Sequence, residues 1–329
     1  MYYINNKDNT DPWLNLALEE FAVRNLDKKR DYILLYVNQP SLIIGKHQNV
    51  LEEVDIKTAG ELNIPIIRRI SGGGTVYHDT GNLNISMITE HTIKNFNKYY
   101  DFLQPVVKVL EDLALSVQIN KRNNLILKNK KISGNAQFTS RQRLLSHGTL
   151  LFNTNLDVMN RLIKPENDKN IDSRSTKSIR SAVTNISDCL RIKYTVSDLK
   201  QHILDTIFYN GIKQYELTHD EWQCVEELSR TRYKSWQWNY GLSPDCTITK
   251  EIETGFGQAS VELFIEDGLI KNMRIKNSNS HPELINKLCK YFINKPVDYE
   301  SVKSIIANIR RNKALKPLNR IDWMDIIYN

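Results

Sequence analysis

The stretch RRISGGGTVYHDTGN, residues 68–82, places two arginines, a serine, three consecutive glycines and a His-Asp pair within fifteen positions. Glycine loses more conformational freedom on ordering than any other residue, so three in a row need a physical reason. The amides of a glycine loop can converge on an oxyanion, and bare backbone lets an elongated ligand lie against the chain. The stretch therefore predicts a ligand site, although the spacings of a P-loop and of a dinucleotide-binding loop are both absent.

The two adjacent arginines, Arg68 and Arg69, fall on a predicted strand. Successive side chains of a strand point to opposite faces. At most one of the two can therefore point into a site, and we expect the other to face solvent or a carboxylate.

Short strands and helices alternate around the glycines. DPWLNLALEEF, residues 11–21, has a capping aspartate, a proline at the first helical position and helical apolar spacing. Further helices are predicted over residues 50–62, 98–115, 156–163, 196–209 and 220–233, and strands over 31–37, 41–45, 64–70, 75–78, 83–89, 116–120, 124–139 (with a sharp turn at 128–130) and 143–153. Several strands in succession favour antiparallel pairing. The fold class is therefore predicted to be α+β, with a mixed, largely antiparallel sheet flanked by helices.

The pattern changes near residues 243–247. Beyond this point the sequence alternates on both sides of Asp267-Gly268, which is a strong hairpin signal. A helix follows with Ser280 and Glu283 in capping-box spacing, and a last helix is predicted over 299–313. We therefore predict a catalytic domain over 1–245 and a small α+β accessory domain over 246–329.

Composition places the chain among ordinary globular proteins, with 40% hydrophobic and 25% charged residues. The N-terminal sequence MYYINNKDNTDPW lacks the apolar core of a secretory signal, and no apolar run approaches the roughly 18 residues of a membrane span. The expectation is a cytoplasmic protein without a membrane segment. The cysteines Cys189, Cys224, Cys246 and Cys289 are scattered, which indicates neither a zinc site nor a disulfide framework.

Positive charge is concentrated in one part of the chain. Between Asp112 and Asp157 there is no acidic residue, whereas the cations Lys121, Arg122, Lys128, Lys130, Lys131, Arg141 and Arg143 all lie there. Such a stretch suits phosphates, carboxylates, an acidic protein or nucleic acid. Nucleic acid is disfavoured, because few aromatic side chains interleave with these cations.

A second glycine element, KKISGNAQ at residues 130–137, lies inside this basic stretch. A lysine that follows a turn and enters a strand can be held pointing inward, where one ammonium meets both a carboxylate and a phosphate; Lys131 is the candidate. Downstream, His147 lies in SHGTLLFN. It has no serine or cysteine at motif spacing, so no catalytic triad is predicted.

Taken together, RRISGGGTVYHDTGN, KKISGNAQ, SHGTLLFN, SIRSAVTNI (178–186) and SWQWNYGLSP (235–244) closely resemble the lipoate-protein ligase family, over nearly the whole chain. The resemblance implies a biotin/lipoate ligase-like catalytic domain with a small C-terminal accessory domain. It also implies a reaction in two halves: lipoate attacks the α-phosphorus of ATP with Mg²⁺ to give lipoyl-AMP, and a lysine of a carrier protein then takes the lipoyl group. The implied carriers are E2 subunits of 2-oxoacid dehydrogenases and the glycine-cleavage H protein, and the expected enzyme is a monomer that uses neither nucleic acid nor a membrane.

Site roles follow from the resemblance motif by motif. The residues implied to bind ATP are Arg69, Gly74, Thr75, Val76, Tyr77 and Lys131. Those implied to bind lipoate are Ser71, Gly72, Gly73, Gly74, His78 and Lys131. Those implied to support the loops are Asp79, Asn82, Asn124, Ser133, Gly134 and His147. Lys131 is implied to be catalytic, and the magnesium ligands are not identified.

One departure from the family pattern keeps alternatives open. Asn124, in KRNNLIL, stands where family members usually carry an acid, so ATP-dependent activation could be weakened and the chain could instead move lipoyl groups between carriers without ATP. Octanoyl transferases of the same fold use a cysteine thioester; Cys189 is the cysteine nearest the catalytic stretch, but it lies in no motif. Biotin ligation is disfavoured because the Gly-Arg-Gly-Arg-Arg-Gly loop is absent.

Overall fold

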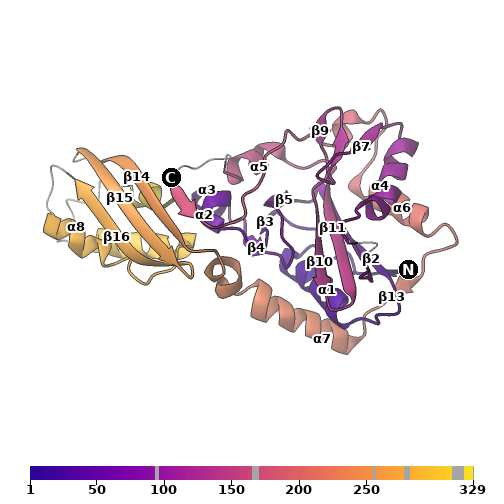
Figure 1. Ribbon diagram of the computed structural model, residues 1–329, viewed down its shortest axis with the longest axis horizontal. Coiled ribbons are helices and arrows are strands. Elements are labelled where there is room, and N and C mark those ends of the chain that lie inside the picture. Colours follow the sequence, from indigo (N-terminus) through magenta and orange to yellow (C-terminus); the bar gives the residue numbers. More distant parts are fainter. Residues whose placement is uncertain (93–95, 165–169, 255–256, 278–281, 313–321, 329) are drawn as a thin grey trace. The chain divides into compact units, whose positions relative to one another are not determined.

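The computed structural model describes residues 1–92, 96–164, 170–254, 257–277, 282–312 and 322–328. The chain divides into two compact units (Figure 1). The first contains residues 1–46, 67–159 and 179–235, and the second contains residues 47–66, 160–178 and 236–329. Two segments that precede residue 245 in the sequence thus pack with the C-terminal region, and the division at 245/246 stays a prediction.

A six-stranded sheet forms the centre of the first unit. Across the sheet the strands are β10 (Asn135–Ser140), β11 (Arg143–Leu151), β6 (Asn82–Glu90), β2 (Tyr32–Val37), β1 (Tyr2–Ile4) and β13 (Gln214–Tyr215). Neighbours from β10 to β2 pair antiparallel, and β2, β1 and β13 pair parallel. The predicted α+β class, with a mixed and largely antiparallel sheet, is confirmed.

Helices cover both faces of this sheet, as strand alternation requires. On one face Ile85 packs with α4 (Tyr100–Asp112) and α6 (Val196–Ile207) in a large apolar cluster. On the other, the neighbouring Ser86 donates a hydrogen bond to Glu19 of α1 (Pro12–Asn25). Asp11 caps α1 by accepting from the amides of residues 13 and 14, so the predicted start of this helix is confirmed.

Two three-stranded sheets carry the sequence motifs. One contains β4 (Ile66–Arg68), β3 (Ser41–Ile44) and β5 (Val76–His78), with the glycines between β4 and β5. The other contains β7 (Val117–Ile119), β8 (Leu125–Leu127) and β9 (Lys130–Lys131). Lys128 and Asn129 have φ of 48° and 64°, the left-handed conformation of a tight hairpin, which confirms the predicted turn.

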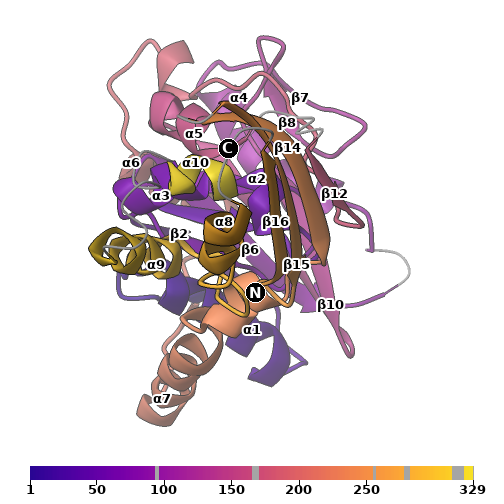
Figure 2. The ribbon, with the colours of Figure 1, turned by 90° about the vertical axis from the view of Figure 1, so that its left-hand side faces the viewer.

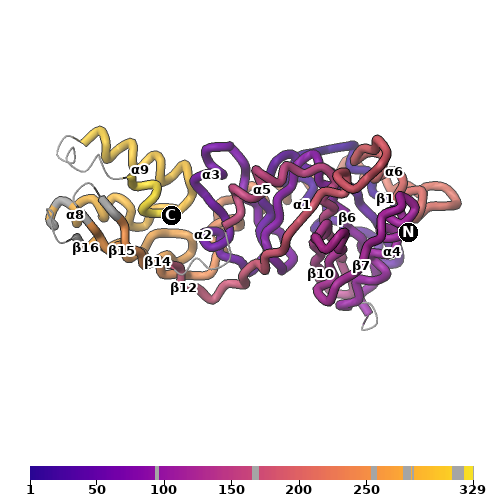
Figure 3. Tube along the Cα trace, turned by 90° about the horizontal axis from the view of Figure 1, so that it is seen from above, coloured from indigo at the N-terminus to yellow at the C-terminus, as the bar shows by residue number. Residues whose placement is uncertain are grey.

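The second unit contains the antiparallel sheet β12 (Ile171–Ser173), β14 (Cys246–Thr254), β15 (Gly257–Glu266) and β16 (Leu269–Asn277). Asp267 and Gly268 have φ of 51° and 69° at the β15–β16 turn, so the predicted hairpin is confirmed. Helices α8 (Pro282–Cys289) and α9 (Tyr299–Arg311) lie on one face of this sheet (Figure 2). Figure 3 shows α3 (Ile56–Glu61) beside the C-terminal helix α10 (Trp323–Tyr328).

Several elements differ from the sequence-based expectation. The predicted helix over 50–62 is two short helices, α2 (Val50–Glu53) and α3, because Asp55 begins a new helix by accepting from the Thr58 amide. Ser280 of the predicted capping box lies outside the described residues. The remaining helical elements are α5 (Leu156–Leu162), η1 (Ser187–Cys189), α7 (His219–Leu228), η2 (Ser229–Tyr233) and η3 (Gln237–Gly241). No helix within the described ranges is long and apolar enough to cross a membrane.

Candidate active site

The glycine loop is held by one buried arginine. Arg69, 6% exposed, donates from Nε to Ser71 Oγ at 3.0 Å and from Nη1 to the Ile43 carbonyl at 3.1 Å. Its Nη2 donates to the carbonyls of Gly72 and Gly74 at 2.6 and 2.8 Å. A planar guanidinium can bind several fixed acceptors at once. Arg69 therefore sets the path of the loop backbone.

Two of the glycines differ in what they require. Gly73 has a φ of +90°, and a Cβ added there would lie 3.0 Å from Arg69 Nη2, so both its conformation and its surroundings demand glycine. A Cβ on Gly72 would meet nothing within 4 Å. The loop is thus tightly packed on its arginine side and has free space at Gly72, where a ligand can lie against the backbone.

The neighbouring Arg68 does not face solvent. It is fully buried and donates from Nη1 to the carbonyls of Gly45 and Lys46, at 3.1 and 3.2 Å. Burial, followed by the charge of Arg69, lowers its pKa to about 10. Of the two expected environments, solvent or a carboxylate, solvent is wrong, because main-chain carbonyls just after β3 provide acceptors inside the protein.

The backbone of Lys131 is fixed on both sides by a distant motif. Its amide donates to the Ala182 carbonyl at 2.8 Å, and its carbonyl accepts from the Thr184 amide at 3.2 Å. These residues belong to SIRSAVTNI, which pairs beside β9 in a parallel bridge at Val183. The structure thus brings together two motifs that are some fifty residues apart in the sequence.

The ammonium of Lys131 has no counterion among the residues that the structure describes. A Cβ added to Gly134 would lie 3.3 Å from Nζ, so the side chain folds back over this glycine. Burial, followed by the charges of Arg69 and Arg122, lowers the pKa of Lys131. Within the described part of the chain, Nζ makes no hydrogen bond or ion pair. A half-buried cation near other cations is unfavourable unless an anion binds, which makes Lys131 a candidate anion-binding residue.

A hydrogen-bonded chain connects the glycine loop to α1. Ser71 Oγ lies 2.6 Å from His147 Nε2, and His147 Nδ1 lies 3.0 Å from Glu19 Oε2. All three residues are less than 10% exposed. The sequence prediction concerned motif spacing only; the serine that contacts His147 lies 76 residues earlier, in the glycine loop after β4. Ser71 is only 1% exposed and also accepts from Arg69 Nε, so its hydroxyl stabilises the loop, and its role in lipoate binding stays a prediction.

Glu19 is the functional residue that sequence reasoning missed. Tyr36 OH donates to its Oε1 at 2.9 Å, and Ser86 Oγ donates to the same oxygen. Burial alone raises the pKa of Glu19, but the charge and hydrogen bond of His147, with the bonds from Ser86 and Tyr36, lower it by more, to below 4.5. A signal was present in LALEEF, since a carboxylate in an apolar helical stretch needs partners when buried.

This carboxylate predicts an acid-dependent contribution to stability. Because the folded-state pKa of Glu19 lies below 4.5, its contribution is complete above pH 4.5 and is lost as the pH falls through the folded-state pKa. Glu19→Gln is expected to lower the free energy of unfolding by about 1–3 kcal/mol at pH 7, and by less in acid. Urea unfolding at pH 7 and at an acid pH measures the loss of stability under each condition. Equal losses at both would contradict it.

His78 lies on β5, and its side chain is buried, with 3% exposed. Its Nδ1 lies 3.0 Å from Nδ2 of Asn38. Burial lowers its pKa to about 3, with smaller effects from Glu19, Arg69 and His147, so the ring is neutral at physiological pH. Its Nε2 is enclosed, and no hydrogen-bond partner is found for it among the described residues.

The other predicted site residues lie around this centre. Val76 and Tyr77 pair with Ile43 and Leu42 of β3, directly after the buried Thr75. The residues predicted to support the loops all make local hydrogen bonds. Asp79 accepts from the amides of Gly81 and Asn155, and Asn82 Nδ2 donates to Asn84. In the second glycine element, Ser133 donates to Asn135, and the Gly134 amide donates to Thr149 Oγ1. Asn124, 8% exposed, donates its amide to the Asn120 side chain at 3.0 Å.

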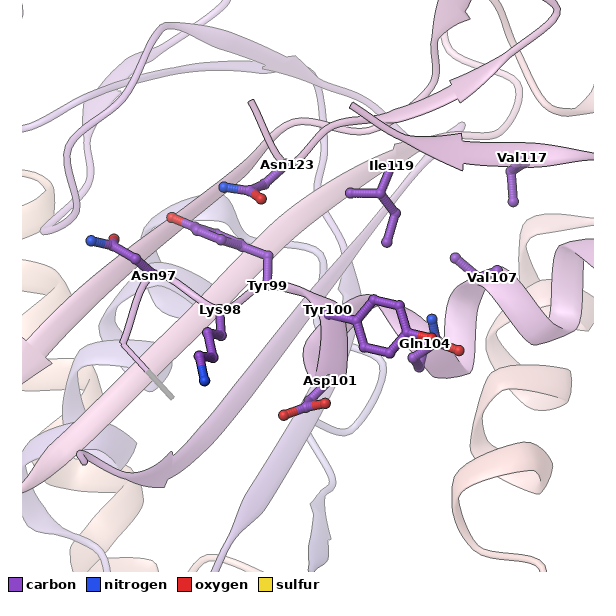
Figure 4. A pocket seen from close by; sticks show the side chains of 10 residues that line it. All are labelled: Asn97, Lys98, Tyr99, Tyr100, Asp101, Gln104, Val107, Val117, Ile119 and Asn123. Carbon is purple, nitrogen blue, oxygen red and sulfur yellow. The ribbon is translucent and has the colours of Figure 1, made fainter. Parts of the chain in front are cut away.

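A separate hollow of about 720 Å³ opens near the start of α4 (Figure 4). Figure 4 shows Tyr99 and Tyr100 from the start of α4, with Ile119 of β7 and Asn123 from the following turn. None of the glycine-loop residues lines it. It therefore adds nothing to the predicted site.

The fold and the site together define a class of protein: an enzyme in which two small sheets beside a mixed sheet present a glycine loop, and a lysine without a counterion in the described structure, to an anionic substrate. Family comparison makes this specific. The catalytic-domain model of the lipoyl protein ligases A and B matches residues 11–208, and the C-terminal model of bacterial lipoate protein ligases matches residues 243–327.

Curated relatives agree along the full chain. The chain is 36% identical to the lipoate-protein ligase LplJ of Bacillus subtilis over 332 residues, with 100% of both chains covered. It is 39% identical to lipoate-protein ligase 1 of Staphylococcus aureus over 276 residues, which covers 84% of each. The chain belongs to the lipoate-protein ligase family.

Solved structures agree on the fold. Plasmodium falciparum LipL1, solved in complex with lipoate, has a TM-score of 0.61 at 22% identity, covering 97% of this chain and 98% of that one. A lipoate-protein ligase A bound with ATP also has a TM-score of 0.61, at 24% identity, over 70% and 95% of the two chains.

Proposed function

We propose that the chain activates lipoate with ATP to form lipoyl-AMP and then transfers the lipoyl group to a lysine of a lipoyl domain or H protein. The observation that supports this is the half-buried Lys131 ammonium, which has no counterion in the described part of the chain and lies within range of the charges of Arg69 and Arg122. Two anions that repel each other, a carboxylate and a triphosphate, have to meet at one place in this reaction. A site with surplus positive charge offsets that repulsion.

Lys131 has the central role in the first half-reaction. A carboxylate oxygen of lipoate attacks the α-phosphorus, a new O–P bond forms, and the bond to the leaving pyrophosphate breaks. Negative charge builds on the phosphoryl oxygens during this step, and a preorganised ammonium stabilises it. Because Gly134 has no Cβ, Lys131 can fold back to this position without steric conflict.

The glycine loop orients the substrate rather than reacting with it. Arg69 uses its guanidinium on the loop carbonyls, so we assign it the role of shaping the loop against which the acyl chain and nucleotide lie. In the second half-reaction a neutral lysine amine attacks the acyl carbon, the C–O bond to AMP breaks, and the amine releases a proton to solvent. The lipoyl-AMP is already activated, so no enzyme nucleophile is needed.

Acceptor binding is assigned to the exposed basic residues beside Lys131. Lys121, Arg122, Lys128 and Lys130 are all exposed on or next to the β7–β8–β9 sheet. An acidic carrier domain would be attracted to this surface, and such complementarity raises association rates more than affinity.

The described residues offer no dedicated magnesium site. No group of three or more His, Cys, Asp or Glu side chains that could hold a metal is found in the described part of the chain. Asn124, at the position of the usual acid, provides no charge. These residues do not form a magnesium site of their own, so an ion that accompanies ATP would be held mainly by phosphate oxygens. No step is assigned to it.

One experiment tests the proposal and its ATP-independent alternative. The enzyme is incubated with an apo H protein and either free lipoate or a lipoylated donor domain, each with and without ATP and Mg²⁺, and lipoyl-AMP and lipoylated H protein are measured by mass spectrometry. We expect both products only with ATP. Lipoylation from a lipoylated donor domain in the absence of ATP, with no lipoyl-AMP, would support the amidotransferase instead.

A cysteine-free variant is expected to keep its activity. Burial raises the pKa of Cys246 and of Cys289 to about 11, so both thiols are protonated and poorly nucleophilic at neutral pH. Cys224 is exposed on α7, and Cys189 packs beside the apolar cluster. With all four replaced by serine or alanine, lipoylation should stay within about twofold of the wild type. A loss of turnover with the fold intact would indicate a thioester enzyme.

A further inference from the structure

Three asparagine side chains form a directional chain that ends at His78. Asn6 Nδ2 donates to Asn15 Oδ1 at 3.0 Å, Asn15 Nδ2 donates to Asn38 Oδ1 at 2.9 Å, and Asn38 Nδ2 lies 3.0 Å from His78 Nδ1. All four side chains are at most 3% exposed. The chain is therefore sealed from solvent, and each orientation depends on its neighbour.

Main-chain carbonyls fix the direction of this chain. Asn15 Nδ2 also donates to the carbonyl of Asn9 at 2.9 Å, and a carbonyl can only accept. The amide nitrogen of Asn15 must therefore point this way, which puts the oxygen of Asn38 toward Asn15 and its nitrogen toward His78. Nδ1 of His78 then accepts, so in a neutral ring the proton is on Nε2.

A buried donor without an acceptor is thus present behind the glycine loop. No hydrogen-bond partner of Nε2 is found among the described residues, although the atom is enclosed. An unpaired buried donor costs about 1–3 kcal/mol. Nε2 therefore needs an acceptor, and a bound ligand can supply it.

The position of this donor relative to Lys131 can be estimated along β11. Thr149 accepts from the Gly134 amide beside the Lys131 ammonium, and His147 lies two residues away on the same face of that strand. Two residues of a strand span about 7 Å. That distance is comparable with the carbon chain that separates the carboxyl group of lipoate from its dithiolane ring. His78 lies near this far end, because its partner Asn38 is bonded to Asn15 of α1. Asn15 lies one helical turn from Glu19, which contacts His147.

We propose that Nε2–H of His78 donates to a dithiolane sulfur and so makes the enzyme prefer lipoate to octanoate. This rests on the proposed function. Divalent sulfur is a weak hydrogen-bond acceptor, whereas the corresponding methylene groups of octanoate accept nothing. Sites that provide a hydrogen bond discriminate strongly against an analogue that lacks the partner. For so weak an acceptor, we expect discrimination on the order of tenfold in kcat/KM.

Two variants test the donor in different ways. His78→Phe removes it, and Asn38→Asp replaces the donating amide by an acceptor, which favours Nδ1–H and turns Nε2 into an acceptor. Both should lower the ratio of kcat/KM for lipoate over octanoate by on the order of tenfold, mainly through lipoate. Pyrophosphate release gives kcat/KM for lipoate and for octanoate, and thermal unfolding shows whether each variant is folded. His219→Gln, at an exposed histidine of α7, is the matched control and should keep the wild-type ratio.

A direct measurement needs no variant. Long-range ¹H–¹⁵N NMR of the wild-type enzyme should show His78 as the Nε2–H tautomer from pH 6 to 8. The Nδ1–H tautomer, or an unchanged lipoate-to-octanoate ratio in a folded variant, would overturn the inference. A wild-type enzyme that forms acyl-AMP from neither acid would instead overturn the proposed function, and the tautomer would still report whether the donor exists.

Discussion

Lys131→Met is expected to lower the rate of lipoyl-AMP formation by a factor on the order of 10² to 10³, because the reacting phosphoryl group loses its preorganised cation. The same substitution should leave the unfolding temperature unchanged or raise it. Lys131 is a charge without a partner in the described structure, and its pKa is lowered by burial, so a neutral side chain of similar length removes an unfavourable charge. Pyrophosphate release and thermal unfolding measure the two effects.

The adjacent lysine provides the matched control. Lys130 is exposed on the same short strand, so Lys130→Met removes an equal charge at almost the same place in the sequence. We expect it to change acyl-AMP formation by less than about threefold, which is the scale of a screened surface charge. Equal losses in the two variants would mean that the site responds to net charge alone, and Lys131 would lose its assigned role.

Arg69→Lys should be nearly as damaging, although it conserves the charge. The guanidinium donates hydrogen bonds to Ser71, Ile43, Gly72 and Gly74, and one ammonium cannot reach acceptors spread in this fork. Leaving buried carbonyls unpaired costs about 1–3 kcal/mol each. We expect adenylation to fall by a factor on the order of 10², together with a lower unfolding temperature, because both depend on the path of the loop.

The opposite changes in stability separate the two roles. Loss of activity with unchanged or raised stability is expected for a residue that acts on substrate, as at Lys131, whereas loss of both is expected for one that shapes the loop. The exposed Arg191 provides the control, and Arg191→Lys should alter neither property. A fully active and stable Arg69→Lys enzyme would show that the loop keeps its path without the guanidinium.

Much of the fold could be predicted because its signals are local. The start of α1 follows from Asp11 and Pro12, and the β15–β16 turn follows from Asp267-Gly268, since cap and turn residues act within a few positions of themselves. The predicted single helix over 50–62 was wrong because the apolar pattern continues across Asp55, where the backbone instead starts a new helix.

The candidate site was predictable only in part. Resemblance of motifs identified the glycine loop and Lys131, but Glu19 and Asn38 act through hydrogen bonds to residues 128 and 40 positions away in the sequence. Such contacts depend on which strands become neighbours, and local pattern does not contain that information. The burial of Arg68 was missed for the same reason, since its acceptors lie just after β3 and precede it by more than twenty residues.

The asparagine chain from Asn6 to His78 also has a consequence for how this sequence can vary. Because every amide in it donates in the same direction, reversing one member forces the next into an arrangement with two donors or two acceptors face to face. Single replacements in the chain should therefore be disfavoured, while concerted replacements of adjacent members should be tolerated. Among homologous enzymes, positions 6, 15, 38 and 78 are expected to covary, and changes at 38 should accompany altered acyl-chain preference more often than changes at 6.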